Sequence, residues 1–125
     1  MGIFNFFSNK KEFGKPFKDY FANGSIKLEA FKKDGIWNGP YKEYYPNGNV
    51  HNKGNYQYGK LNGPFTEYYE NGVINMTGNM KNGSWDGAVV SNYESGNVMI
   101  KGNRNKSGWD GLYQEFFENG NLKFE

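Results

Sequence analysis

The chain has 125 residues, the length of a single domain, and its 15 basic and 13 acidic residues leave a formal net charge of +2. This small and mixed charge argues against nucleic acid as a partner, and the absence of cysteine excludes disulfides and thiolate metal sites. The 18 glycines and the 19% of aromatic residues are typical of many short strands joined by tight turns.

The first segment, residues 1–14, precedes a regular repeat. Its apolar residues have near-helical spacing, which predicts one or two helical turns within residues 1–13; they are Ile3, Phe4, Phe6 and Phe7. Two interpretations stay open. The segment either caps the exposed edge of the first predicted hairpin, or it docks on a membrane or a partner through these four side chains.

No segment approaches the roughly 18–20 consecutive apolar residues that span a bilayer. The first residues also lack the basic leader and cleavage pattern of a secretory signal. Together with the absence of cysteine, these features lead us to expect a cytoplasmic protein, or one peripheral to a membrane.

A 24-residue repeat fills residues 15–125, in five units at 15–38, 39–62, 63–86, 87–110 and 111–125. Its clearest column is a glycine preceded by Asn or Ser, formed by Gly24, Gly48, Gly72, Gly96 and Gly120. A further column is Gly54, Gly78 and Gly102, and another is Trp37, Leu61, Trp85 and Trp109. So many columns in one register make the repeat the organising feature of the chain.

Each unit reads as a β-hairpin. Asn-Gly between apolar runs predicts a tight type I′ turn, which needs positive φ at both central residues. In the second unit we expect a strand at 40–45, a turn at 46–49, a return strand at 50–56 and a looser glycine-rich loop at 57–63. Tyr41, Glu43 and Tyr45 should then point to one side, with Lys42 and Tyr44 on the other.

Five hairpins predict an all-β fold, an elongated antiparallel meander of about ten strands in which each unit contacts only its neighbours. Aromatic rings stacked along the columns should hold the units together. The fifth return strand lies at the end of the sequence, so we expect an open edge there through which the chain could self-associate.

The pattern Tyr44-Tyr45-Pro46-Asn47-Gly48, followed by Gly59-Lys60-Leu61-Asn62-Gly63-Pro64-Phe65, resembles the MORN repeat. More closely, it resembles the bacterial MORN-repeat variant of the YwqK-family antitoxins. The resemblance spans residues 15–125 and implies an elongated hairpin array that binds proteins, with contact to phospholipid head groups as a weaker implication. An antitoxin would neutralise its partner by binding it. The fourth unit departs from the pattern, with Val89, Val90, Ser91 and Asn92 in place of aromatic, polar, acidic and aromatic residues.

Little in the sequence points to catalysis or to a cofactor. The one histidine, His51, occupies a variable column, so neither a histidine-dependent nucleophile nor a zinc site is expected. Asp19, Glu43, Glu67 and Glu115 form an acidic column with roughly 9–10 Å between successive members, but the repeat itself imposes that spacing. We therefore predict a non-enzymatic protein with no catalytic residues, no cofactor and no metal.

The candidate binding site is an aromatic column on the strand face opposite Tyr45, formed by Tyr20, Tyr44, Tyr68 and Phe116. Tyrosine is favoured at protein interfaces, which predicts a protein partner for this stripe. The alternative is that ring stacking and twist cover both faces. The rival function is a membrane-associated protein that contacts phospholipid through its N-terminus or its repeats.

Overall fold

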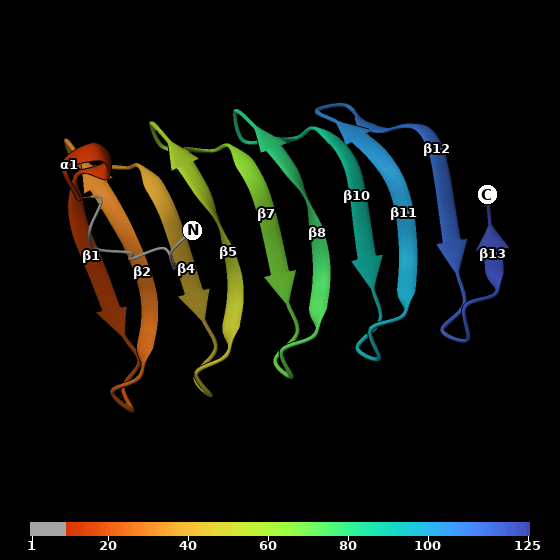
Figure 1. The fold of residues 1–125 in the computed structure, drawn as a ribbon, viewed down its shortest axis with the longest axis horizontal. Coiled ribbons are helices and arrows are strands. Elements are labelled where there is room, and N and C mark those ends of the chain that lie inside the picture. The colour runs from red at the N-terminus through yellow and green to blue at the C-terminus, as the bar shows by residue number, and fades with distance from the viewer. Residues whose placement is uncertain (1–9) are drawn as a thin grey trace, which may run out of the picture.

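A computed structural model describes residues 10–125 as one antiparallel sheet of 13 strands (Figure 1). Ten of them follow one another across the sheet, and two-residue strands pair beside three of these. The elements are α1 (Lys10–Phe13), β1 (Lys15–Tyr20), β2 (Ile26–Lys33), β3 (Ile36–Trp37), β4 (Gly39–Tyr44), β5 (Val50–Gln57), β6 (Lys60–Leu61), β7 (Gly63–Tyr68), β8 (Ile74–Lys81), β9 (Ser84–Trp85), β10 (Gly87–Asn92), β11 (Val98–Asn105), β12 (Gly108–Phe116) and β13 (Leu122–Phe124). The predicted all-β antiparallel meander is confirmed, and sequence reasoning missed β3, β6 and β9.

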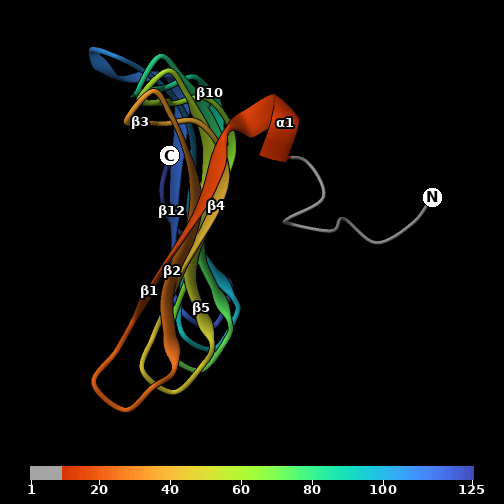
Figure 2. The ribbon, with the colours of Figure 1, turned by 90° about the vertical axis from the view of Figure 1, so that its left-hand side faces the viewer.

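The hairpins stand side by side along one axis, with β1 and β13 at the two ends (Figure 1). Seen along that axis, the described chain is a single twisted layer, with α1 on one side and β3 on the other (Figure 2). Within residues 10–125, no second sheet covers this layer. The hairpins must therefore bury their apolar side chains against one another within each face.

One face carries a row in which bulky and small residues alternate, and we call it the glycine face. The row follows from the register across the sheet and consists of Phe17, Ala30, Tyr41, Gly54, Phe65, Gly78, Val89, Gly102 and Tyr113. The small residues exist because neighbouring rings lie directly over them: a Cβ on Gly78 would come within 2.8 Å of the Trp85 ring. Tyr41 and Val89, which are buried, belong to this row.

The Asn-Gly turns differ from the prediction. In the second unit the Gly48 amide donates to the Tyr45 carbonyl and the Tyr45 amide donates to the Asn49 carbonyl. Gly48 has φ of 93°, whereas positive φ outside glycine is confined, among the described residues, to Asp34, Tyr58 and Asn82. Because Asn47 is not left-handed, the turn is a three-residue loop, a type I turn followed by a left-handed glycine, and the predicted type I′ turn is wrong.

A tight type I′ geometry occurs at the opposite end of the hairpins. Tyr58 and Gly59, with φ of 49° and 86°, join β5 to β6 as a two-residue turn. Asp34-Gly35 and Asn82-Gly83 do the same for β2 to β3 and β8 to β9. The loose loop predicted at 57–63 is therefore wrong, since it contains this tight turn and strand β6.

Adjacent units are joined by hydrogen bonds that repeat along the array. The hydroxyl groups of three tyrosines donate to a backbone carbonyl of the following unit, in the pairs Tyr45 to Tyr68, Tyr69 to Asn92 and Tyr93 to Phe116, at 2.6–2.7 Å. Side-chain amides in the turns act in the same way: Asn49 donates to the Glu70 carbonyl at 2.9 Å. Each unit thus satisfies polar backbone groups of the next one.

Helix α1 is a single turn that packs against the sheet face opposite the glycine face. The Phe13 ring lies 5.5 Å from the ring of Phe31, which is only 1% exposed. Asn38 donates to the Phe13 carbonyl at 3.4 Å, and a Cβ on Gly39 would clash with the Phe13 side chain. The apolar residues of the predicted N-terminal segment, Ile3, Phe4, Phe6 and Phe7, lie outside the described residues.

Candidate functional site

The acidic column lies on the glycine face, in the row next to the stacked rings. The pairing register alternates each carboxylate with a residue of the neighbouring return strand, so Glu43 and Glu67 flank Asn52. The corresponding return-strand positions in the other units hold Leu28, Met76, Ile100 and Phe124. Asn52 therefore makes the second unit the polar part of this row.

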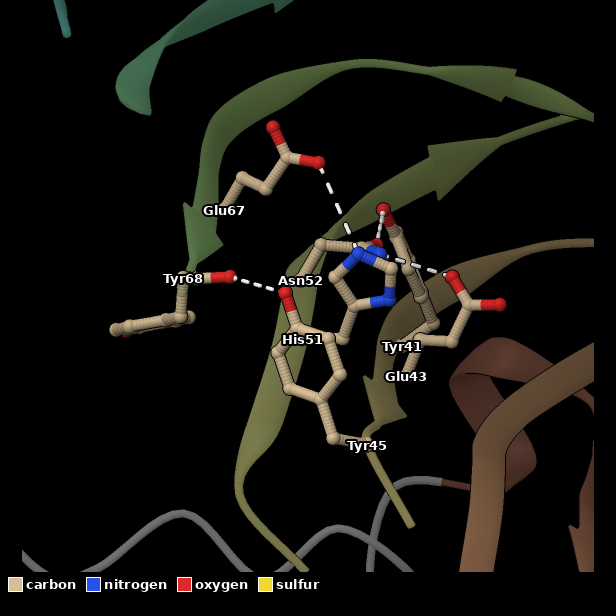
Figure 3. A network of polar contacts seen from close by, with 7 residues as sticks. All are labelled: Tyr41, Glu43, Tyr45, His51, Asn52, Glu67 and Tyr68. Carbon is tan, nitrogen blue, oxygen red and sulfur yellow. Dashed lines mark hydrogen bonds and ion pairs between the residues drawn. The ribbon is translucent and has the colours of Figure 1, made fainter. Parts of the chain in front are cut away.

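Around Asn52 the side chains form one network (Figure 3). Tyr41 donates its hydroxyl to Asn52 Oδ1 at 2.7 Å, and Asn52 Nδ2 donates to Glu43 Oε1 at 2.8 Å. His51 Nε2 lies 3.9 Å from Glu67 Oε2, and its ring stacks on Tyr45 with the centroids 4.3 Å apart. His51 is the extra residue of a β-bulge between the pairs Glu43–Asn52 and Tyr44–Val50, which brings it to the same face as Asn52.

The electrostatics of this network favour neutral tyrosines. Burial raises the pKa of the Tyr41 hydroxyl far above its usual range, with Tyr56, Glu43 and Glu67 adding to the effect. A phenol that stays protonated serves as a hydrogen-bond donor, which is how Tyr41 acts here. Within residues 10–125, no group of three or more His, Asp or Glu side chains is placed to hold a metal ion. The network therefore has the character of a structural contact between units.

The opposite face carries a mid-strand row of lysines, and we call it the lysine face. Its row contains Lys18, Glu29, Lys42, Lys53, Thr66, Thr77, Val90, Lys101 and Gln114. Lys42 and Lys53 are paired directly across β4 and β5. This pair gives the second hairpin a local excess of positive charge. Like charges directly opposite one another are unfavourable in a sheet, so the pair costs some stability.

The aromatic column lies beside the lysine row on this face, and we call it the tyrosine stripe. Each member is paired with an aliphatic residue of its own hairpin, in the pairs Tyr20–Ile26, Tyr44–Val50, Tyr68–Ile74 and Phe116–Leu122. Tyr20 is 54% exposed, and Tyr44, Tyr68 and Phe116 are half-buried. Figure 3 shows the Tyr68 ring pointing away from the Asn52 network.

Lysines and Glu29 make contacts with the stripe. The Tyr44 hydroxyl donates to Glu29 Oε1, and Lys18 Nζ lies 3.8 Å from Glu29 Oε2. Burial raises the pKa of Tyr44 far above its usual range. The hydrogen bond to Glu29 and the negative charge of Glu29 raise it further. Lys53 Nζ lies 5.8 Å from the Tyr68 ring centroid, within reach of a cation–π contact. The stripe and the lysines thus form one mixed surface.

The fourth unit interrupts the stripe, because Asn92 replaces its tyrosine. Asn92 Nδ2 donates instead to the Ile74 carbonyl at 3.1 Å. Pairing with β8 is kept, with Val90 opposite Thr77 and Ser91 opposite Met76. The departure therefore changes the surface of the lysine face and leaves the sheet intact.

The lysines were missed as site residues by sequence reasoning. The available signal was strand alternation, since Lys42 stands two residues before Tyr44 and must share its face. Lys53 could not be placed from alternation alone, because its position beside Tyr68 depends on the pairing of β5 with β7.

The one helix in the described part of the chain, α1, is far too short to span a bilayer, and no other membrane-spanning helix occurs within residues 10–125.

Comparison with protein families gives three matches, at residues 37–58, 61–82 and 109–125, all to one family model. The matching family is the MORN repeat variant. Between the second and third matched segments lie residues 83–108, which include most of the fourth unit, where the aromatic pattern is interrupted. MORN repeats are generally non-enzymatic modules that mediate contacts with proteins or membrane lipids. No curated protein matches the chain.

Proposed function

We propose that this MORN-repeat chain is a non-enzymatic protein-interaction module whose lysine face binds an acidic protein surface. The observation that supports this most directly is the placement of the tyrosine stripe beside Lys42 and Lys53 on the face opposite the stacked rings. Tyrosine is enriched among the few residues that dominate the binding energy of protein interfaces, and flanking charges steer the encounter. The other face has its rings packed on glycines and is committed to stability.

The stripe and the lysine row have distinct roles in this proposal. Tyr44 and Tyr68 provide ring faces at the centre, and truncation of such a residue commonly costs at least about 2 kcal/mol of binding energy. Lys42 and Lys53 select for carboxylates on the partner, because these two positive charges lie directly opposite one another. In the finer form of the proposal the chain is a cytoplasmic antitoxin, and the bound partner is a toxin that it neutralises.

The test is affinity purification of the tagged chain from its own host, followed by binding measurements with the purified partner. We expect Tyr44→Ala and Tyr68→Ala each to weaken binding by about 30-fold. Lys42→Glu should also weaken binding, and its effect should be larger at low salt than at high salt. Tyr58→Ala is the matched control, since Tyr58 is 74% exposed in a turn away from the stripe. Equal affinity of all four variants would refute the assignment of this face.

The same variants separate the membrane alternative. The chain is sedimented with vesicles of neutral lipid and with vesicles that contain anionic lipid, with and without residues 1–9. This deletion keeps Phe13 on Phe31. Lipid binding that depends on residues 1–9, or that replaces protein binding on the lysine face, would favour the membrane-associated function. Neutralisation is tested separately, by co-expressing the captured partner with the wild-type chain or with Tyr68→Ala.

A further inference from the structure

The fourth unit leaves a gap in the tyrosine stripe. In the second unit the stripe ring reaches back over the return strand of the preceding unit, where the Tyr44 hydroxyl donates to Glu29. In the fourth unit Asn92 has no ring, and its side-chain amide donates to the Ile74 carbonyl at 3.1 Å. We call the resulting gap over Ile74, Asn92 and Val98 the notch.

The notch lies inside the array. Its floor is formed by β8, β10 and β11, and β7 and β12 stand on its two sides (Figure 1). Tyr68 on β7 and Phe116 on β12 are four strand spacings apart, roughly 19 Å, which is twice the distance between neighbouring members of the stripe. All five strands belong to the described sheet, so the notch does not depend on what lies beyond either outermost strand.

Apolar surface is exposed where the ring is missing. Ile74 is 38% exposed, whereas Ile26 and Val50, which precede units with a stripe tyrosine, are half-buried. A pocket of about 300 Å³ adjoins the notch on the side of the fifth unit, and its lining consists of Asn97, Val98, Lys101, Phe116, Asn119 and Gly120. This volume is at the lower end of the range for small-molecule sites and is large enough for one side chain.

A lysine stands on each side of the notch. Lys101 is the one charged residue in the lining of the adjoining pocket, and within residues 10–125 no carboxylate lies at ion-pair distance from it. Lys53 occupies the same column of the repeat and lies beside the Tyr68 ring on the other side. An occupant of the notch therefore meets two positive charges, which favour carboxylates.

We propose that the notch receives one aromatic side chain of an acidic partner segment, whose carboxylates contact Lys53 and Lys101. The inference rests on the proposed function, because it names the anchor that a partner places on the lysine face. The ring takes the place of the missing tyrosine over Ile74 and completes the stripe. One carboxylate enters the pocket beside Lys101.

The strand spacing sets the length of this segment. Lys53 on β5 and Lys101 on β11 are four strand spacings apart, again roughly 19 Å. An extended chain covers roughly 3.3 Å per residue, so two acidic residues about six positions apart reach both lysines. A residue midway between them lies over β8, where Ile74 is exposed. The partner segment is thus an aromatic residue with an acidic residue about three positions away on each side.

The probe is a heptapeptide with blocked ends, glutamate at its first and last positions, phenylalanine at its centre and serine elsewhere. It is titrated into the isotope-labelled full chain, and the backbone amide signals are followed by NMR. We expect saturable shifts at Ile74, Val98 and Lys101. The same peptide with alanine at its centre should bind at least about tenfold more weakly, because it lacks the anchor.

Two pairs of variants test the notch and the charge. Asn92→Tyr fills the notch with the residue that the repeat carries elsewhere, so it should weaken binding at least about tenfold. Asn92→Ala loses the same hydrogen bond to Ile74 but leaves the notch open, and it should bind as the wild type does. Lys101→Glu should weaken binding about tenfold at low salt, whereas Lys106→Glu, in the turn between β11 and β12, is its charge-matched control. Thermal melts check that each variant keeps the fold.

Four outcomes would overturn the proposal. They are no shifts at millimolar peptide, equal binding of the alanine peptide, equal or tighter binding by Asn92→Tyr, and binding that appears only when residues 1–9 are deleted. The third would mean that an unbroken stripe is the better surface, and the fourth that the chain's own first residues occupy the notch. A captured partner that responds to Tyr44→Ala but not to Asn92→Tyr would end this inference and leave the proposed function standing.

Discussion

The two faces of the sheet are built from the same strands, yet they use aromatic residues in opposite ways. On the glycine face the rings lie on glycines and on one another, as Phe65 and Trp85 do with centroids 5.9 Å apart. On the lysine face, Tyr44 and Tyr68 are half-buried and contact charged side chains. A single-layer protein can therefore pack the rings of one face for stability and present charged and aromatic side chains together on the other.

The largest expected contrast is between Tyr41 and Tyr44, which stand three residues apart on opposite faces. Tyr41 is 6% exposed, and its ring centroid lies 4.9 Å from that of Tyr56. Tyr41→Ala should therefore lower the free energy of unfolding by about 3–5 kcal/mol. Tyr44→Ala should cost about 1 kcal/mol, because its ring is half-buried. Urea denaturation measures both, and equal losses would mean that the two faces share the stabilising role.

The second contrast lies within the glycine face. A Cβ on Gly78 meets the Trp85 ring at 2.8 Å and the Ala88 carbonyl oxygen at 3.2 Å, so Gly78→Ala should destabilise the fold by about 1–3 kcal/mol. Gly54→Ala is the matched variant, because its nearest ring atom, on Tyr41, is 3.1 Å away. Gly54→Ala should cost less, and the reverse order would contradict ring-on-glycine packing as the origin of this column.

These contrasts also mark what the sequence could predict. Columns such as Gly54, Gly78 and Gly102 recur in one register. That recurrence was sufficient to predict the antiparallel hairpin array and every strand except the three shortest ones. Alternation likewise separated Tyr41 from Tyr44. Both are properties of position along one strand, which a sequence displays directly.

Turn geometry could not be predicted in the same way. Asn-Gly is compatible with a type I′ turn and with a type I turn followed by a left-handed glycine. Here the Asn47 side chain accepts a hydrogen bond from the Asn49 amide at 2.9 Å, which accompanies the second geometry. At the opposite end of the hairpin, Tyr58 adopts positive φ, which is uncommon for a residue other than glycine and could not be predicted from a tyrosine. The contacts between units, such as Lys53 with Tyr68, depend on these turns.

A third prediction concerns high pH. In the unfolded chain a tyrosine ionises near pH 10, whereas in the folded protein burial holds the pKa of Tyr41 far higher. Below pH 10 both states keep the proton and this stability is fully present; above it the unfolded state loses its proton first, so stability falls as pH rises. The slope should approach about 1.4 kcal/mol per pH unit for Tyr41. Tyr41→Phe should make the fall shallower in urea denaturation at pH 9–11, and an unchanged slope would contradict this assignment.

The smallest expected effect tests the hydroxyl groups that join the units on the glycine face. Tyr69→Phe keeps the ring and removes only the hydrogen bond to the Asn92 carbonyl, at 2.6 Å, so it should cost about 1 kcal/mol. Phe21 and Phe117 occupy the same column naturally, which shows that the ring alone is compatible with the fold. Because neighbouring units couple in a repeat array, hydrogen exchange should report faster opening of the third and fourth units and little change at β1. Uniform acceleration along the whole sheet would mean that the hydroxyl groups act on global stability, and that the joints between units are not separate points of weakness.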